Sequence, residues 1–222
     1  MSSTYLAQGI VLARHDYREV DRIVTIFTDE YGKIDAVARG VRKPLSKLAG
    51  HLEPFSYSSF MLATGRTFDV LATSVKLSSF RIPQSDVLSF ALATYFFEAT
   101  DRLTRQRQPD RALFGLLVRF LELFEASLDP HGGSPAFQRV LLTEFFLFRL
   151  IHHLGFAPLL DRCALGKELL GTDDLAMSTA HGGFVCREHR TGNSTAQAIS
   201  PQTVEILRLM ADGHLEALRF VQ

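Results

Sequence analysis

Residues 32–55 decide the fold and read Gly-Lys-Ile-Asp-Ala-Val-Ala-Arg-Gly-Val-Arg-Lys-Pro-Leu-Ser-Lys-Leu-Ala-Gly-His-Leu-Glu-Pro-Phe. A short β-branched run leads into a segment punctuated by Gly40 and Pro44. Because Gly admits positive φ and Pro supplies no backbone donor, we expect a loop there. Against one acid, Asp35, residues 32–51 contain five cations: Lys33, Arg39, Arg42, Lys43 and Lys47. The sequence therefore predicts a basic loop whose cations are exposed to water.

The residues on either side of this loop have the composition of β-strands. Short β-branched and aromatic runs, separated by turn signals, occupy residues 10–12, 22–27, 34–38, 60–63 and 68–72. Five strands in this space predict a small barrel over residues 1–81. A five-stranded barrel with a basic loop is the arrangement of oligonucleotide-binding (OB) folds, in which cations follow phosphates and aromatic rings stack on bases.

The positive charge of the chain is concentrated in this first part. Residues 1–81 contain 11 basic and 8 acidic side chains, whereas the whole chain has a formal net charge of +0. The residues that we expect to bind the phosphates of DNA are Lys33, Arg39, Arg42, Lys43 and Lys47, joined by Arg14, Arg22 and Arg66. The alternative for the loop is an ordinary solvated turn, since most charged runs have no ligand.

After Pro83 the spacing of apolar residues changes from two to about 3.6, which predicts helices. Asp86 stands at the N-cap of a helix over residues 86–104, whose buried residues are expected to be Leu92, Tyr95, Phe96 and Leu103. Further helices are predicted from about Asp110, over residues 136–154, and from Ser200. The expected fold is α+β: an OB-type barrel, then a helical domain over 82–222 that is interrupted at 159–198 by an irregular, zinc-ribbon-like loop region.

The loop region contains two half-motifs of a zinc ribbon. They are Cys163-Ala-Leu-Gly166 and Cys186-Arg-Glu-His189, and one half lacks its second ligand. A structural zinc site requires four ligands, whereas these motifs supply only Cys163, Cys186 and His189. His181 could be the fourth. We predict that the loop folds without stoichiometric metal.

Several functional classes have no support in the sequence. Dinucleotide-binding, phosphate-loop and helical zinc-hydrolase motifs do not occur, and no catalytic constellation is visible, so neither an enzyme nor a cofactor is expected. The most apolar run, residues 145–151, is too short to span a bilayer and contains Arg149, so no membrane partner is expected. The N-terminus lacks the features of a signal peptide, and two cysteines form no disulfide framework, which indicates a reducing cytoplasm.

Six segments together resemble the RecO family of bacterial recombination mediators, over essentially the whole chain. They are Asp21-Arg-Ile-Val-Thr-Ile-Phe27, residues 32–43, Leu52-Glu-Pro-Phe55, Leu154-Gly-Phe-Ala-Pro158, Asp161-Arg-Cys163 and Gly183-Phe-Val-Cys186. The resemblance implies an N-terminal OB barrel, a helical domain, and a zinc ribbon that some members have and others lack.

The resemblance also implies a function in DNA repair and homologous recombination, in the cytoplasm and associated with the nucleoid. Its members bind single- and double-stranded DNA, anneal single strands, and help RecR displace single-strand-binding protein so that the recombinase can load. A basic residue before a Phe is thought to receive the acidic C-terminal tail of single-strand-binding protein. This chain has Glu144-Phe145 there, so Arg139 or Arg149 would have to take that role beside an apolar groove.

Two other classes of function remain open. One is a protein-interaction scaffold that uses the helical domain and does not bind DNA. The small excess of basic over acidic residues in the barrel would be consistent with this class. The other is a metal hydrolase built on the Cys/His loop, for which the sequence offers no partner that would activate water.

Overall fold

The structure, a computed structural model, describes residues 3–46, 48–128, 136–191 and 196–215. The chain divides into two compact units, Met1–Thr143 and Glu144–Gln222. Each unit is described by itself.

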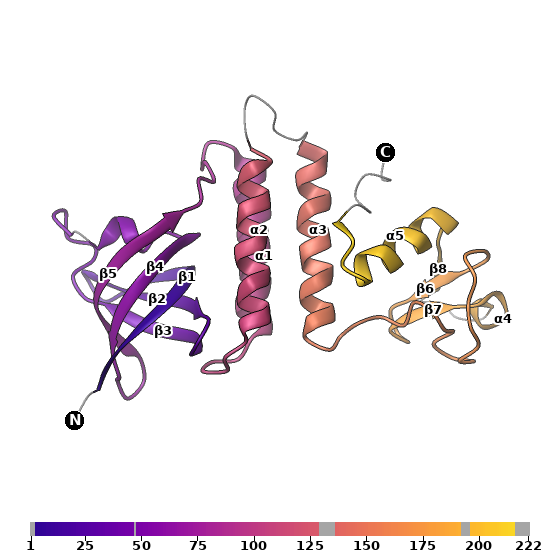
Figure 1. Cartoon of the computed structure of the whole chain (residues 1–222), viewed down its shortest axis with the longest axis horizontal. Helices are drawn as coiled ribbons and strands as arrows, with labels where there is room; N and C mark the ends of the chain where they lie inside the picture. The colour runs from indigo at the N-terminus through magenta and orange to yellow at the C-terminus, as the bar shows by residue number, and fades with distance from the viewer. Residues whose placement is uncertain (1–2, 47, 129–135, 192–195, 216–222) are drawn as a thin grey trace. The chain divides into compact units, whose positions relative to one another are not determined.

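The first unit begins with a closed five-stranded barrel (Figure 1). Its strands are β1 (Thr4–Tyr17), β2 (Asp21–Thr28), β3 (Gly32–Ala38), β4 (Ser56–Ala63) and β5 (Asp69–Ser79). Neighbours follow the order β1-β2-β3-β5-β4; β3 and β5 pair in parallel and the other pairs are antiparallel. The predicted strands and the OB-type barrel are confirmed, and each strand is longer than its apolar run.

β1 closes the barrel because it pairs with β2 along one edge and β4 along the other. A register shift between Val11 and Ala13 bends the strand where it changes partners. Gly9 lies in this region, where a Cβ atom would come within 2.7 Å of Ile26 Cγ2. Alternate side chains of the strands fill the interior, among them Ile26, Ile34 and Phe60, which are fully buried.

Two helices follow the barrel in the first unit: α1 (Val87–Leu103) and α2 (Arg111–Ala126). Both begin as predicted at an aspartate, and Asp86 and Asp110 accept hydrogen bonds from the third residue of their helices, Ser89 N at 3.1 Å and Leu113 N at 2.9 Å.

The predicted buried face of α1 is partly wrong. Phe96 is buried, but Tyr95 and Leu103 are exposed and Leu92 is only half-buried. The buried side chains are Ser89, Ala93, Phe96, Phe97 and Thr100. Two of these are polar, yet the Ser89 hydroxyl donates to Asp86 and the Thr100 hydroxyl donates to the Phe96 carbonyl, so burial leaves neither hydroxyl unsatisfied.

The connection between α1 and α2, residues 104–110, packs against the barrel. The amide of Arg107 donates to the Lys33 carbonyl at 2.9 Å, and the Arg107 side chain forms an ion pair with Asp69, which also accepts from the Tyr5 hydroxyl. Gly32 has a φ of +68°, and a Cβ atom there would lie 2.1 Å from the Gln108 carbonyl oxygen, so only glycine fits this contact.

A third helix, α3 (Ala136–His153), spans the boundary between the two units. It coincides with the helix predicted over residues 136–154. Gly155, which follows it, has a φ of +85° and so ends the helix.

The second unit contains a small sheet that the sequence did not predict. Strands β6 (Ala176–Ser178), β7 (Gly183–Val185) and β8 (Ala196–Ala198) pair in the order β7-β6-β8, and one turn of helix, α4 (Arg187–Arg190), follows β7 (Figure 1). Residues 159–198 are therefore not irregular throughout. Helix α5 (Pro201–Ala211) begins at the predicted N-cap, where Ser200 accepts from Thr203 N at 3.1 Å. None of the helices in the described ranges is long and apolar enough to cross a membrane.

Candidate functional site

The basic loop between β3 and β4 is held against the turn between β1 and β2. The amide of Gly40 donates to Asp21 Oδ1 at 2.7 Å, and Gly40 has a φ of +62°. The amide of Arg42 donates to the Val20 carbonyl at 3.0 Å, and its guanidinium donates to the Glu19 carbonyl at 3.2 Å. These bonds fix the start of the loop, so its cations stand at one end of the barrel.

Three of the predicted DNA-binding residues form ion pairs at this end of the barrel. Asp16 accepts from Arg22 Nε at 2.9 Å and lies 3.4 Å from Arg42 Nη1. The hydrogen bond from Arg22, and then the charges of the nearby arginines, hold the pKa of the Asp16 carboxyl below its usual range. Arg14 pairs with Glu53.

Other cations at this end of the barrel are exposed and can contact a ligand without first leaving an ion pair. Arg39, Lys43 and Arg66 are exposed, and no ion pair of theirs is found among the residues that the structure describes. Arg66 lies in the turn between β4 and β5. Lys47 was predicted to belong to the same group, and it lies outside the described residues.

Two aromatic rings and a further cation lie at the ends of strands near this turn: Tyr17 is the last residue of β1, Arg18 follows it, and Phe68 directly precedes β5. The rings of Tyr17 and Phe68 meet edge to face with centroids 6.2 Å apart, and both residues are half-buried. The guanidinium of Arg18 lies 5.2 Å from the Tyr17 ring centroid. None of the three was predicted as a site residue from the sequence; the signals available were Tyr17-Arg18 just before the second β-run and the aromatic residue that opens the fifth run, Phe68.

For Lys33 the prediction of an exposed cation is wrong. Lys33 lies in β3 and is only 7% exposed. Its Nζ lies 2.9 Å from Asp101 Oδ1 and also donates to the Asp101 carbonyl. Asp101 takes two of the three N–H donors of this ammonium, and burial keeps the group away from a DNA strand, so we leave Lys33 out of the interface.

The two arginines expected to bind an acidic tail both have partners within the chain. Arg139 lies 3.6 Å from Asp86 Oδ2. Arg149 is half-buried and donates to the carbonyl of Ala211, the last residue of α5. Both residues lie on α3, Arg139 in its part of the first unit and Arg149 in its part of the second.

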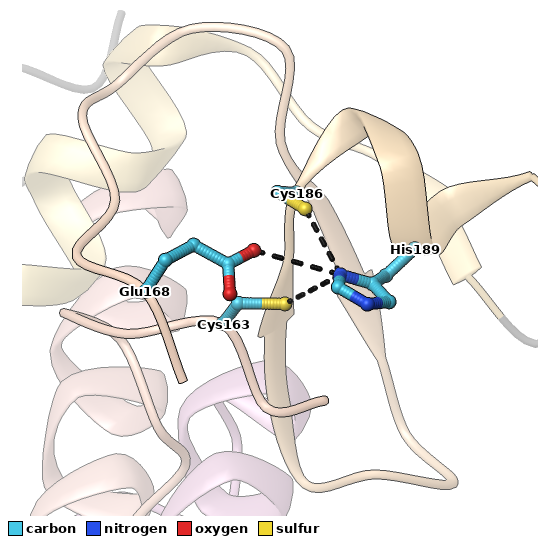
Figure 2. A group of neighbouring side chains, drawn as sticks. All are labelled: Cys163, Glu168, Cys186 and His189. Carbon is cyan, nitrogen blue, oxygen red and sulfur yellow. Dashed lines mark hydrogen bonds and ion pairs between the residues drawn. The ribbon is translucent and has the colours of Figure 1, made fainter. Parts of the chain in front are cut away.

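The second unit brings two cysteines, a histidine and a glutamate together (Figure 2). The ligand atoms of Cys163, Glu168, Cys186 and His189 all lie within 4.8 Å of one another. His189 Nδ1 is 3.5 Å from Cys163 Sγ, 3.2 Å from Cys186 Sγ and 3.5 Å from Glu168 Oε1. The Glu168 carboxylate, together with burial, raises the pKa of the Cys186 thiol.

The fourth member of this cluster is not the residue that the sequence suggested. Sequence analysis proposed His181, whereas His181 Nδ1 is hydrogen-bonded to Ser178 Oγ at 2.9 Å. Glu168 takes the fourth position instead. It was missed because it stands five residues after Cys163, outside the spacing of a zinc half-motif, although it is the first acid that follows Cys163 in the sequence.

The barrel and the cations at its end place the chain in the class of proteins built on an OB-type fold. Family models for "Recombination protein O N terminal" and "Recombination protein O C terminal" match residues 1–80 and 84–221. The chain is 31% identical over 211 residues to the DNA repair protein RecO of Listeria monocytogenes serotype 4a, covering 95% of this chain and 78% of that protein.

Two further relatives are similar to the same extent. DNA repair protein RecO of Exiguobacterium sibiricum is 31% identical over 201 residues, with 90% of this chain and 76% of that protein covered. The protein of the same name from Bacillus mycoides is 30% identical over 202 residues, with 91% and 77% covered. The chain belongs to the RecO family of DNA repair proteins, as its sequence motifs predicted.

Proposed function

We propose that this chain binds and anneals single-stranded DNA through the basic end of its barrel. It thereby helps to displace single-strand-binding protein, so that recombinase can load on the DNA. The observation that supports this most directly is the position of Arg39, Arg42 and Lys43. The hydrogen bonds of Gly40 and Arg42 hold them beside the β1–β2 turn and its Arg18. A held group of cations loses less conformational freedom when it binds phosphates than a free loop would.

Annealing requires that two negatively charged strands approach each other while their bases remain free to pair. Cations that contact phosphates reduce the repulsion between the strands and leave the base edges unoccupied. Tyr17 and Phe68 are half-buried and in edge-to-face contact with each other, which suits transient stacking rather than sequence reading. The proposed site therefore binds single strands of any sequence, and duplex DNA through the same phosphate contacts.

The proposal is tested by the rate at which two complementary oligonucleotides anneal. Replacing Arg39, Arg42 and Lys43 together by Ala should lower the affinity for single strands about 100-fold at 0.1 M salt, because three phosphate contacts are lost, and annealing should slow accordingly. A matched control replaces Arg102, Arg111 and Arg119, exposed cations of α1 and α2, by Ala. The proposal fails if both triple variants anneal DNA at the wild-type rate.

For partners, we propose RecR and the acidic tail of single-strand-binding protein, with Arg139 or Arg149 as the cation that meets a tail carboxylate. To bind the tail, Arg139 would have to leave Asp86, and Arg149 would have to leave the Ala211 carbonyl. Arg139→Glu and Arg149→Glu are each expected to weaken binding of a tail peptide to the full chain. Unchanged peptide affinity in both variants, with an unchanged circular dichroism spectrum, would reject these two residues.

A further inference from the structure

We propose that Cys163, Cys186, His189 and Glu168 bind one zinc ion, and that Glu168 supplies the ligand that the zinc half-motif lacks at Gly166. The prediction of a metal-free loop depended on a set of three ligands. The structure adds a fourth, a carboxylate that lies against the same imidazole as the two sulfur atoms (Figure 2).

The distances fit a tetrahedral zinc site. With zinc bonds of about 2.3 Å to sulfur and about 2.1 Å to nitrogen and oxygen, tetrahedral angles place sulfur and nitrogen about 3.6 Å apart and oxygen and nitrogen about 3.4 Å apart. The two observed sulfur–nitrogen distances are 3.5 and 3.2 Å, and the oxygen–nitrogen distance is 3.5 Å. A small adjustment of side chains would therefore suffice to bind the ion.

The Glu168 carboxylate lies directly beside Gly166. A Cβ atom built on Gly166 would lie 2.0 Å from Glu168 Oε2 and 2.6 Å from His189 Cε1. The carboxylate therefore occupies the space that a side chain at position 166 would fill. A glutamate two residues further along the chain replaces the ligand that the half-motif lacks.

The backbone supports the same arrangement. The amide of Gly166 points to Cys163 Sγ at 3.4 Å, and the amide of Cys163 donates to the Glu168 carbonyl at 2.9 Å. Lys167 has a φ of +63°, which turns the chain so that Glu168 comes back towards Cys163. On the other side, one turn of α4 brings His189 round to Cys186, three residues before it. Outer contacts of this kind orient metal ligands.

The donor set selects zinc over the common hard cations. Two thiolates and an imidazole suit zinc, whereas magnesium and calcium prefer oxygen ligands. Cys163 is fully buried, while the side chains of His189 and Glu168 are 38% and 43% exposed, so an ion can enter from their side. Bound zinc would also neutralise two units of negative charge where two thiolates and a carboxylate converge.

The test begins with the zinc content and zinc affinity of the full chain purified under reducing conditions. We expect one zinc per chain in the wild type and its loss in the Cys163→Ser, Cys186→Ser double variant. Glu168→Gln should weaken zinc binding at least tenfold, because even an outer-sphere partner is worth about 10- to 100-fold. The matched control is Glu188→Gln, an exposed acid between Cys186 and His189 that is not part of the cluster.

A second variant separates loss of a ligand from loss of folding. Gly166→Cys combined with Glu168→Ala exchanges the carboxylate for a thiolate in the same space, and it should restore the zinc affinity that Glu168→Ala loses. Cobalt in place of zinc reports the change directly, because the sulfur-to-cobalt charge-transfer absorption should increase when a third thiolate binds.

Three results would overturn the proposal. The first is a folded wild-type chain that takes up no stoichiometric zinc when zinc is supplied. The second is a Cys163–Cys186 disulfide in the protein from reducing conditions. The third is a Glu168→Gln variant that binds zinc as tightly as Glu188→Gln, which would remove Glu168 from the ligand set.

Discussion

At the scale of single residues, the partners of a side chain decide its role, and residue type alone does not. Lys33 and Lys43 stand ten positions apart in the same basic stretch. Lys33 is buried against Asp101, whereas Lys43 is exposed on the loop. A count of charges along the sequence could identify both lysines, but not the aspartate 68 positions away that engages one of them.

This difference predicts opposite effects of the same substitution. Lys33→Met should lower the free energy of unfolding by about 2 kcal/mol, because it removes hydrogen bonds to a charged group and leaves Asp101 without its cation. Its affinity for single-stranded DNA should not change. Lys43→Met should leave stability within about 0.5 kcal/mol, since exposed charges contribute little, and should weaken DNA binding.

Urea unfolding and DNA binding of the two variants provide the measurement. If Lys33→Met were as stable as the wild type and bound DNA more weakly, Lys33 would belong to the interface after all. The assignment of Lys33 to the core would then be wrong.

At the scale of elements, the strongest sequence signals were those that local chemistry determines. The five strands followed from β-branched runs between turns, and the helix starts followed from Asp86, Asp110 and Ser200 as N-caps. The three strands of the second unit are three residues long, which is too short to show an alternation of apolar and polar residues. Their pairing depends on contacts between segments and left no local signal.

The same holds for the functional residues: those defined by local sequence could be predicted, and those brought together by folding could not. The loop cations were visible because they stand close together in the sequence, whereas Tyr17 and Phe68 meet only when the barrel closes. Glu168 was invisible because its position depends on the turn at Lys167.

The connection between α1 and α2 gives a prediction that depends on pH. The Tyr5 hydroxyl donates to Asp69, whose side chain is 1% exposed and which also pairs with Arg107. Desolvation by burial, followed by the hydrogen bond to Asp69, raises the pKa of Tyr5 to about 12. Because the folded pKa is above the unfolded one, the resulting stability is complete below the unfolded pKa of about 10 and is lost as pH rises through 12.

Tyr5→Phe should therefore lower the free energy of unfolding at neutral pH by about 1 kcal/mol, the usual value of one hydrogen bond. Above pH 10 the difference between variant and wild type should shrink. Urea unfolding at several pH values measures it. A difference that stays constant up to pH 12 would show that the Tyr5 hydroxyl does not titrate as the structure requires.

At the scale of the whole molecule, a chain with no net charge must concentrate its cations to bind DNA. The two units differ in what their sites are built to do. The first unit has cations held at the end of a barrel, and the second brings the side chains of Cys163, Glu168, Cys186 and His189 within 4.8 Å of one another. The affinity for DNA should therefore depend on salt through the first unit, and zinc removal should act on the second.

The most direct test of the DNA-binding site is the salt dependence of the dissociation constant for a labelled single-stranded oligonucleotide. Each phosphate contact contributes a slope of about −0.7 in log K against log salt, so contacts from Arg39, Arg42, Lys43, Arg18 and Arg66 predict about −3.5 for the wild type. Replacement of Arg39, Arg42 and Lys43 by Ala should flatten the slope by about 2, whatever the sequence of the oligonucleotide. A triple variant with the wild-type affinity and the wild-type slope would show that the basic loop is an ordinary solvated turn.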